Sequence, residues 1–214
     1  DLIAAKLAQA CRFMSVLCGT ICGALWIMAE PMAQVWSKNA INVDHAVLLI
    51  FIVALLLIGP FILISSFLGF IGRARIGATS KLAIGAIALA ICAAGYQSFG
   101  VLGIAAAISI GDIVGMSIIL LPSTAKLLQM SSLALAGKWT MYSLAGLVPL
   151  LLAGQLLVGG AAGSPLETML LGLLLLPPIA AVTLWIAGIS GEARAAMRAH
   201  VKLIASRLRT SSRT

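Results

Sequence analysis

The sequence predicts an all-α fold, a polytopic membrane bundle of six transmembrane helices. Hydrophobic residues make up 62% of the 214-residue chain and charged residues only 9%, whereas a soluble domain carries about 25% charged residues. The longest apolar runs are hydrophobic on every face, as lipid-exposed helices are. They lack the alternating pattern of membrane β-strands, so helices remain as the structure that satisfies their backbone in lipid.

Six segments come close to the length of about 20 apolar residues that crosses a bilayer. In chain order they are 13–33, 47–71, 76–97, 101–121, 139–159 and 168–189. We expect residues 1–189 to form one six-helix lobe and residues 190–214 to form a basic amphipathic cytoplasmic tail.

The first span follows a short connecting helix over residues 1–12, which suggests that the sequence is a fragment of a longer chain. Prolines inside the later spans are candidate hinges, because proline removes a backbone donor and kinks a helix. They are Pro60, Pro149, Pro177 and Pro178. Prolines are also common in passive membrane helices, so packing without motion is the alternative.

The third and fourth spans are separated only by Tyr96 to Gly100. A connection of this length predicts a tight turn, and the two spans are therefore expected to form an antiparallel hairpin.

The orientation follows from the basic residues, which stay on the cytoplasmic side of short loops. With the N-terminus and C-terminus both cytoplasmic, 13 of the 14 Lys and Arg residues fall inside, and only Lys38 falls outside. The outer segments then hold Glu30, Asp44 and Glu167. The net charge of +8 is thus explained by topology, and we do not expect nucleic acid as a partner.

The tail after the last span shows apolar residues at helical spacing, with basic residues on its other faces. The apolar positions are Met197, Val201, Ile204 and Leu208. This pattern is typical of a helix on an anionic membrane surface. A solvated tail is the alternative.

Asp112 is the single acid in the fourth span, near the middle of residues 101–121. A charge facing lipid at that depth costs at least about 2.5 kcal/mol, so the side chain must face protein or water. Ser109 shares its helix face. Beside them runs a small-residue ridge that lets another helix approach closely, formed by Gly103, Ala107, Gly111 and Gly115. Asp112 either hydrogen-bonds across this helix contact or lines a cavity and handles substrate or cation.

Catalytic and metal-binding patterns are scarce in this sequence. It holds no nucleophile motif, phosphate-binding glycine loop or paired carboxylates. The four cysteines lack the paired spacing of a metal site and read as small apolar residues. We therefore expect no enzyme activity, cofactor or metal.

Three segments together resemble a known family. They are "AEPMAQVWSKNA" after the first span, "LGFIGRARIGATSKLAIG" at the end of the second, and the hairpin "GYQSFGVLGIAAAISIGDIVG". Across residues 7–121, their order resembles the C-terminal half of the multidrug and oligosaccharidyl-lipid/polysaccharide (MOP) flippases, in the polysaccharide-biosynthesis or O-antigen branch.

This resemblance implies membrane transport of lipid-linked oligosaccharide or polysaccharide intermediates, such as those of lipopolysaccharide, across the bacterial inner membrane. The implied mechanism is alternating access, with a missing N-terminal six-helix lobe as partner and the lipid bilayer as surroundings. The implied cavity draws on polar groups within the spans, here Asp112, Ser109, Ser65 and Ser66. Arg73 and Arg75, in the cytoplasmic loop, either contact substrate or act as positive-inside anchors.

Three other functions stay open on the sequence. A cation-coupled multidrug exporter of the same superfamily would share the fold. A membrane assembly subunit without transport would need no polar pathway. An intramembrane enzyme would need a cluster of polar groups at one depth, and only Asp112 with Ser109 comes near to that.

Overall fold

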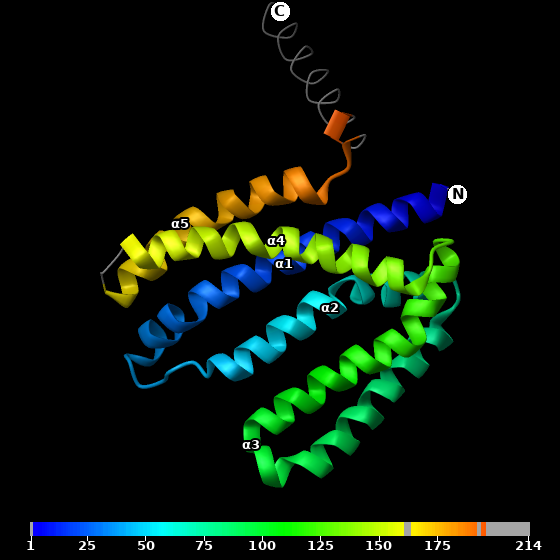
Figure 1. The fold of residues 1–214 in the computed structure, drawn as a ribbon, viewed down its shortest axis with the longest axis horizontal. Helices are drawn as coiled ribbons and strands as arrows, with labels where there is room; N and C mark the ends of the chain where they lie inside the picture. The colour runs from blue at the N-terminus through cyan, green and yellow to red at the C-terminus, as the bar shows by residue number, and fades with distance from the viewer. Residues whose placement is uncertain (1, 161–163, 192–193, 196–214) are drawn as a thin grey trace, which may run out of the picture.

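The computed structural model describes residues 2–160, 164–191, 194 and 195, and these residues confirm the all-helical prediction (Figure 1). Strands are absent from these ranges. The elements in chain order are α1 (Leu2–Ser37), α2 (His45–Phe70), α3 (Ala74–Leu127), α4 (Ser132–Gly160), α5 (Pro165–Thr183) and a π-helical turn η1 (Leu184–Gly188). Five of the helices are long and apolar enough to cross a membrane. The chain is accordingly a multi-pass membrane protein by length and composition.

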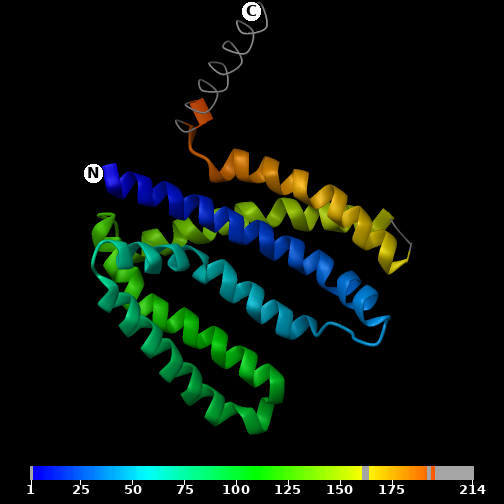
Figure 2. The same ribbon diagram turned by 180° about the vertical axis from the view of Figure 1, so that it is seen from behind.

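Helix α3 contains both the third and the fourth predicted span. The predicted turn over Tyr96 to Gly100 is shorter than expected, because the helix continues through Phe99 and only Gly100 leaves it, at φ 54° and ψ −132°. Glycine adopts this left-handed φ without a steric cost. The helix doubles back there into two arms that lie side by side (Figures 1 and 2). Ile84 and Ala88 of the first arm pack on Gly111 of the second.

Helix α1 lies at the centre of the bundle and contacts α2, α4 and α5. Its contact with α4 is close because glycines face backbone: a Cβ at Gly19 would collide with the carbonyl oxygen of Ser143. In the same way, a Cβ at Gly146 would collide with the carbonyl oxygen of Val16. The small residues therefore bring the two helix backbones together, as in other membrane helix pairs.

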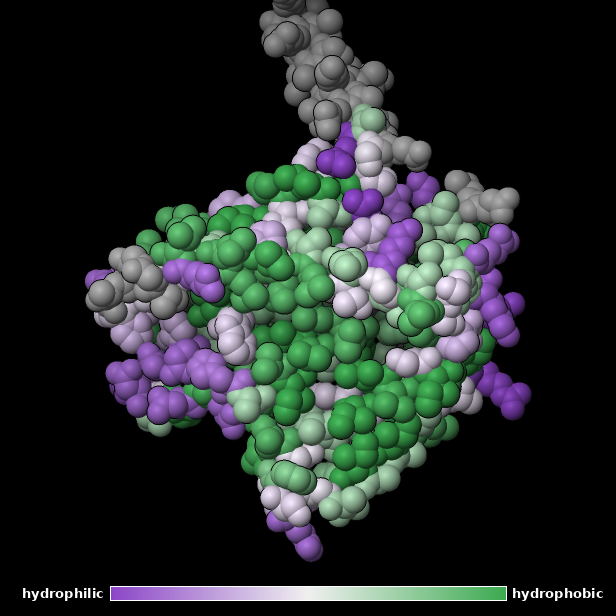
Figure 3. Space-filling view, viewed as in Figure 1, coloured by the Kyte–Doolittle hydropathy of each residue, from purple (hydrophilic) through white to green (hydrophobic). Residues whose placement is uncertain are grey.

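The outer surface of the bundle is apolar along most of its length. Leu82, Leu89 and Leu156 are 73 to 80% exposed. Figure 3 shows apolar residues filling the middle of one face and polar residues gathered toward its edges. A continuous exposed apolar surface of this kind fits contact with lipid rather than water.

The two ends of the bundle differ in charge. One end, which we call the basic end, gathers the start of α1, the α2–α3 turn, the α3–α4 turn and the end of η1 (Figures 1 and 2). Lys6, Arg73, Arg75, Lys126 and Lys138 belong to these segments.

The opposite end holds the α1–α2 loop, the turn at Gly100 and the start of α5. Its acids stabilise local structure. Glu30 accepts hydrogen bonds from the Val43 N–H (3.0 Å) and the Gln34 side chain (2.7 Å), which ties the α1–α2 loop to α1. Asp44 caps α2, and Glu167 forms a capping box with Ser164.

The predicted hinge prolines all lie inside helices that continue past them. Pro60 is fully buried in α2, Pro149 is half-buried in α4, and the Pro177–Pro178 pair is exposed on α5. Their role in motion stays a prediction. Most of the predicted amphipathic tail, residues 196–214, lies outside the described residues.

Candidate functional site

Asp112 lies in the second arm of α3 and is half-buried. Ser109, one helical turn earlier, is only 3% exposed, and its hydroxyl has no hydrogen-bond partner. The Asp112 carboxylate likewise forms no hydrogen bond or ion pair within the described ranges. The two residues therefore place unused hydrogen-bonding capacity on one face of an apolar helix.

The unpaired state of Ser109 departs from the behaviour of other hydroxyls in this chain. Buried Ser15 and Thr124 each donate to the carbonyl four residues earlier in their helix, at 2.8 Å. That local bond is the usual way for a helical hydroxyl to be satisfied in an apolar setting. Only Ser109 and Ser80, both in α3, leave a buried hydroxyl without any partner among the described residues. The α3 hairpin thus holds two buried hydroxyls that can still form a hydrogen bond.

The structure does not bring all four predicted pathway residues together. Ser65 lies near the end of α2 and faces Gly77 near the start of α3. A Cβ added at Gly77 would lie 3.9 Å from the hydroxyl oxygen of Ser65. Ser66 is exposed and donates to the carbonyl of Ile62 at 3.2 Å. Asp112 adjoins Gly111, which packs on Ala88 in the first arm of α3. Ser65 is thus level with position 77 of the first arm, and Asp112 is close to the level of position 88. These two positions are eleven residues, or about 16 Å, apart along the helix, so the serines of α2 lie nearer the basic end than Asp112 does.

The four small residues beside Asp112 are all buried. A Cβ at Gly111 would lie 2.9 Å from the Cβ of Ala88, and one at Gly115 would lie 2.6 Å from Cγ1 of Ile84. Gly103 faces Phe99 and Gly95 at the hairpin turn. Ala107, between them, has no exposed surface. The face next to Asp112 is therefore the contact between the two arms of α3.

Arg73 and Arg75 lie at the α2–α3 turn and are exposed. Arg73 occupies the N-cap position of α3 without a capping hydrogen bond from its side chain. Neither arginine has an ion-pair partner in the part of the chain that the structure describes.

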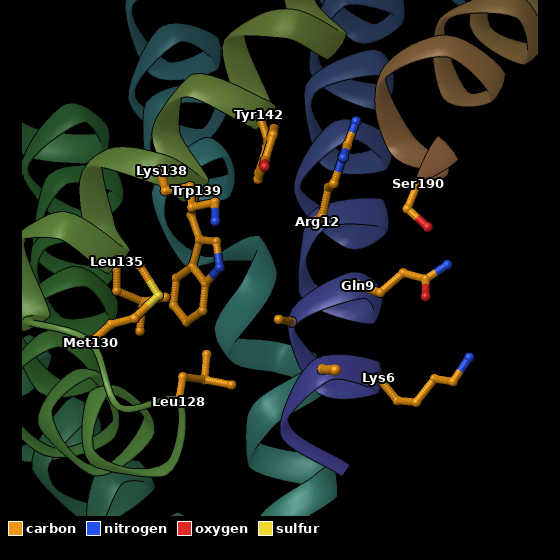
Figure 4. Close-up of a pocket in the computed structure, with 12 residues that line it drawn as sticks. Lys6, Gln9, Arg12, Leu128, Met130, Leu135, Lys138, Trp139, Tyr142 and Ser190 are labelled. Carbon is orange, nitrogen blue, oxygen red and sulfur yellow. The ribbon is translucent and has the colours of Figure 1, made fainter. Parts of the chain in front are cut away.

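A separate cavity of about 330 Å³, which we call the basic pocket, opens at the basic end between α1, the start of α4 and Ser190 (Figure 4). Its polar and charged lining residues are Lys6, Gln9, Arg12, Lys138, Trp139, Tyr142 and Ser190. None of its lining residues within the described part of the chain carries a carboxylate. Its position between two helices places it beside the apolar surface of the bundle.

Arg12 is held in place inside the basic pocket. Its Nε donates a hydrogen bond of 2.7 Å to the carbonyl oxygen of Ala187, at the π-helical turn. Its guanidinium carbon lies 5.0 Å from the centre of the Tyr142 ring, within the range of a cation–π interaction. These two contacts engage one edge and one face of the guanidinium, and its terminal nitrogens have no further partner among the described residues.

Trp139 closes the other side of the basic pocket. Its side chain is 4% exposed and packs edge-on against Phe61, with ring centroids 5.3 Å apart. In Figure 4 its indole lies between the apolar residues of the α3–α4 connection and helix α1. The indole N–H has no hydrogen-bond acceptor among the residues described, and its nitrogen is accessible from the pocket.

Sequence reasoning missed the basic pocket. In the sequence, Lys6, Arg12 and Lys138 count only among the 13 basic residues expected on the cytoplasmic side. Only packing of α1 against α4, which are far apart in the chain, joins these residues into one cavity. Lys138, Trp139 and Tyr142 do share nearby positions on one helix, which is the local signal that the sequence offers.

No group of three His, Cys, Asp or Glu residues could hold a metal ion in the portion of the chain that was described. Comparisons with protein-family models, with curated proteins and with solved structures give no match to this chain. Arguments about its function therefore rest on the residues themselves.

Proposed function

We propose that this chain is one lobe of a transporter that moves lipid-linked oligosaccharide or polysaccharide intermediates across the bacterial inner membrane. The observation that carries this proposal is the polar site of Asp112 and Ser109, with hydrogen-bonding groups unpaired inside an apolar helix. Such groups in a membrane helix commonly mark a substrate or ion pathway. The resemblance of the loop and hairpin segments to MOP flippases supports the same function.

The proposal includes six membrane crossings, with both ends of the lobe in the cytoplasm. Helix α3 has 54 residues and a break at Gly100, so each arm extends about 40 Å and exceeds the roughly 30 Å hydrocarbon core. Two crossings by α3 bring Lys6, Arg73, Lys126 and Lys138 to one side of the membrane. The positive-inside rule makes that side cytoplasmic.

In this mechanism the lobe moves against a second six-helix lobe, so that a cavity between them opens to each side in turn. The polar headgroup of the substrate would face a large desolvation cost in hydrocarbon. Asp112 and Ser109 offset part of that cost by hydrogen bonding, while the lipid tail stays in the membrane.

The test measures transport in vesicles that contain this chain together with its second lobe. Asp112→Asn keeps the shape of the side chain and removes its charge. We expect transport of a lipid-linked oligosaccharide to fall at least tenfold, which corresponds to about 1.4 kcal/mol. Ser66→Ala, an exposed serine with a bond inside its own helix, is the matched control and should leave the rate unchanged. Full transport by Asp112→Asn at equal expression would reject the pathway.

Cation-coupled multidrug export is the second candidate, because a carboxyl group inside a span also suits proton or sodium coupling. The same vesicles separate the two functions. Efflux of a cationic dye that requires a cation gradient and disappears in Asp112→Asn would favour the exporter. An absence of flux for both substrates would favour a non-transporting assembly subunit.

A further inference from the structure

We infer that the basic pocket binds the phosphate headgroup of an anionic phospholipid of the surrounding membrane. This site is separate from Asp112, and binding there does not depend on transport. The inference rests on three features of the pocket: its charge, an unpaired hydrogen-bond donor in its wall, and its two chemically different sides.

The charge of the pocket suits a phosphate. Lys6, Arg12 and Lys138 line one cavity, and none of the lining residues that the structure describes carries a carboxylate. None of the three has an ion-pair partner within the described ranges, and both lysines are exposed at the mouth. Like charges gathered without counter-charges repel one another, and an anion in the cavity relieves that repulsion. Arg12 is also pre-positioned by Ala187 and Tyr142, so little side-chain freedom is lost on binding.

Trp139 supplies a second and independent indication of a ligand. Its side chain is more than nine-tenths buried, and it lines the pocket with an N–H that lacks an acceptor. The indole nitrogen itself is accessible from the pocket, so its N–H can donate to a ligand bound there. A phosphate oxygen in the cavity would satisfy it by a charge-assisted hydrogen bond, the stronger kind.

The two sides of the pocket distinguish a lipid from a free anion. In Figure 4, Lys6, Gln9 and Arg12 lie on the α1 side, while Leu128, Met130 and Leu135 lie on the opposite side, around the Trp139 indole. A soluble phosphate uses only the first group. A phospholipid uses both, because its phosphate contacts the cations while its glycerol and upper acyl chain contact the apolar wall.

The location and size of the pocket agree with this ligand. It lies at the basic end, where the apolar surface of the helices gives way to charged loops. That boundary is where the headgroups of a bilayer meet a membrane protein. The volume of about 330 Å³ falls in the range of small-molecule sites, enough for a headgroup and the adjoining part of a chain.

The experiment measures lipid binding to the purified chain by native mass spectrometry, with phosphatidylglycerol and phosphatidylcholine as probes. We expect phosphatidylglycerol to bind at least tenfold more tightly. Lys6→Gln with Lys138→Gln should weaken phosphatidylglycerol binding about fivefold for each lysine removed. Lys126→Gln is the matched control, since Lys126 is exposed at the same end but does not line the pocket. It should change binding less than twofold.

Trp139→Phe tests the indole N–H without opening the core, because phenylalanine keeps the aromatic contact with Phe61. We expect a loss of about tenfold for phosphatidylglycerol. Circular dichroism of each variant checks that the helices are intact.

Three results would overturn the inference. Equal binding of both lipids would show that headgroup charge has no part in the site. An equal loss with Lys126→Gln would assign the attraction to overall surface charge. Full displacement of phosphatidylglycerol by inorganic phosphate at equal concentration would show a free-anion site instead of a lipid site.

Discussion

Two helix contacts in this bundle depend on glycine, and they differ in what the glycines face. Between α1 and α4, Gly19 and Gly146 face the carbonyl oxygens of Ser143 and Val16, so backbone meets backbone. Between the arms of α3, a Cβ at Gly115 would first meet the side-chain Cγ1 of Ile84, at 2.6 Å, while the Ile84 backbone nitrogen and Cα lie further away, at 3.0 and 3.1 Å. A side chain can change rotamer at a modest cost, whereas a helical carbonyl cannot move without its helix. The α1–α4 contact is therefore the rigid one, and the α3 hairpin is the adjustable one.

The polar groups of the two regions follow the same division. Ser143, fully buried beside the α1–α4 contact, donates a hydrogen bond of 3.0 Å to the carbonyl oxygen of Leu56 in α2. Ser80 and Ser109 in the α3 hairpin have no partners. The region around Ser143, where the hydroxyl is hydrogen-bonded, holds α1, α2 and α4 together. The α3 hairpin, where the buried hydroxyls have no partner, contains the residues that we propose for substrate handling.

The largest loss of stability is expected for Gly146→Leu, which tests the close contact between α1 and α4. We expect this variant to lose about 3 kcal/mol of stability or more, since a side chain there must push α4 away from α1. Denaturation of the purified protein in mixed micelles measures the loss. Gly137→Leu in the same helix is the control, because nothing lies within 4 Å of a Cβ at that position. Comparable losses for both variants would contradict a close α1–α4 contact.

A smaller effect is expected for Gly115→Ala in the α3 hairpin, about 1 to 2 kcal/mol. Its new methyl group would displace the Ile84 side chain, and because the Ile84 backbone lies 3.0 to 3.1 Å away, the two arms would need to separate by only a few tenths of an ångström. Gly85→Ala, with open space around it, is the control and should be neutral or stabilising by up to about 1 kcal/mol. A loss for Gly115→Ala as large as that for Gly146→Leu would show that the hairpin is equally rigid.

The smallest change in stability is expected when Ser143, which forms a hydrogen bond, and Ser109, which forms none among the described residues, are each replaced by alanine. Ser143→Ala removes the bond to Leu56 and should cost about 0.6 kcal/mol, the average for such bonds in a membrane. Ser109→Ala removes no bond that the structure contains, so its unfolding free energy should stay the same or rise slightly. Unfolding curves of both variants under the same conditions measure the difference. A larger loss for Ser109→Ala would reveal a bond at Ser109 and argue against a polar site there.

Much of the fold was predictable because it depends on local properties of the chain. Apolar length and charge distribution identify helices, and the short uncharged segment around Gly100 indicates the hairpin. Contacts between helices that are far apart in the chain cannot be predicted from such local properties. The spacing of Gly19 and Gly23 marks a surface that another helix can approach, but it does not specify α4 as that helix. The basic pocket depends on the same pairing, so its residues stayed separate in the sequence. That Ser65 and Ser66 belong to one pathway with Asp112 stays a prediction, because polar character carries no information on position along a neighbouring helix.

The turn at Gly100 has a consequence for how the protein is made. Only one residue leaves helical geometry there, and no charged side chain occurs between Lys81 and Asp112. In the six-crossing topology that we propose, the tip of the hairpin therefore carries few unpaired polar groups across the lipid during biosynthesis. The two arms of α3 can enter the bilayer together as one preformed unit, with their small residues already in contact. In that order of events, the insertion machinery would release a finished helical pair, and α2 would be the surface on which it docks.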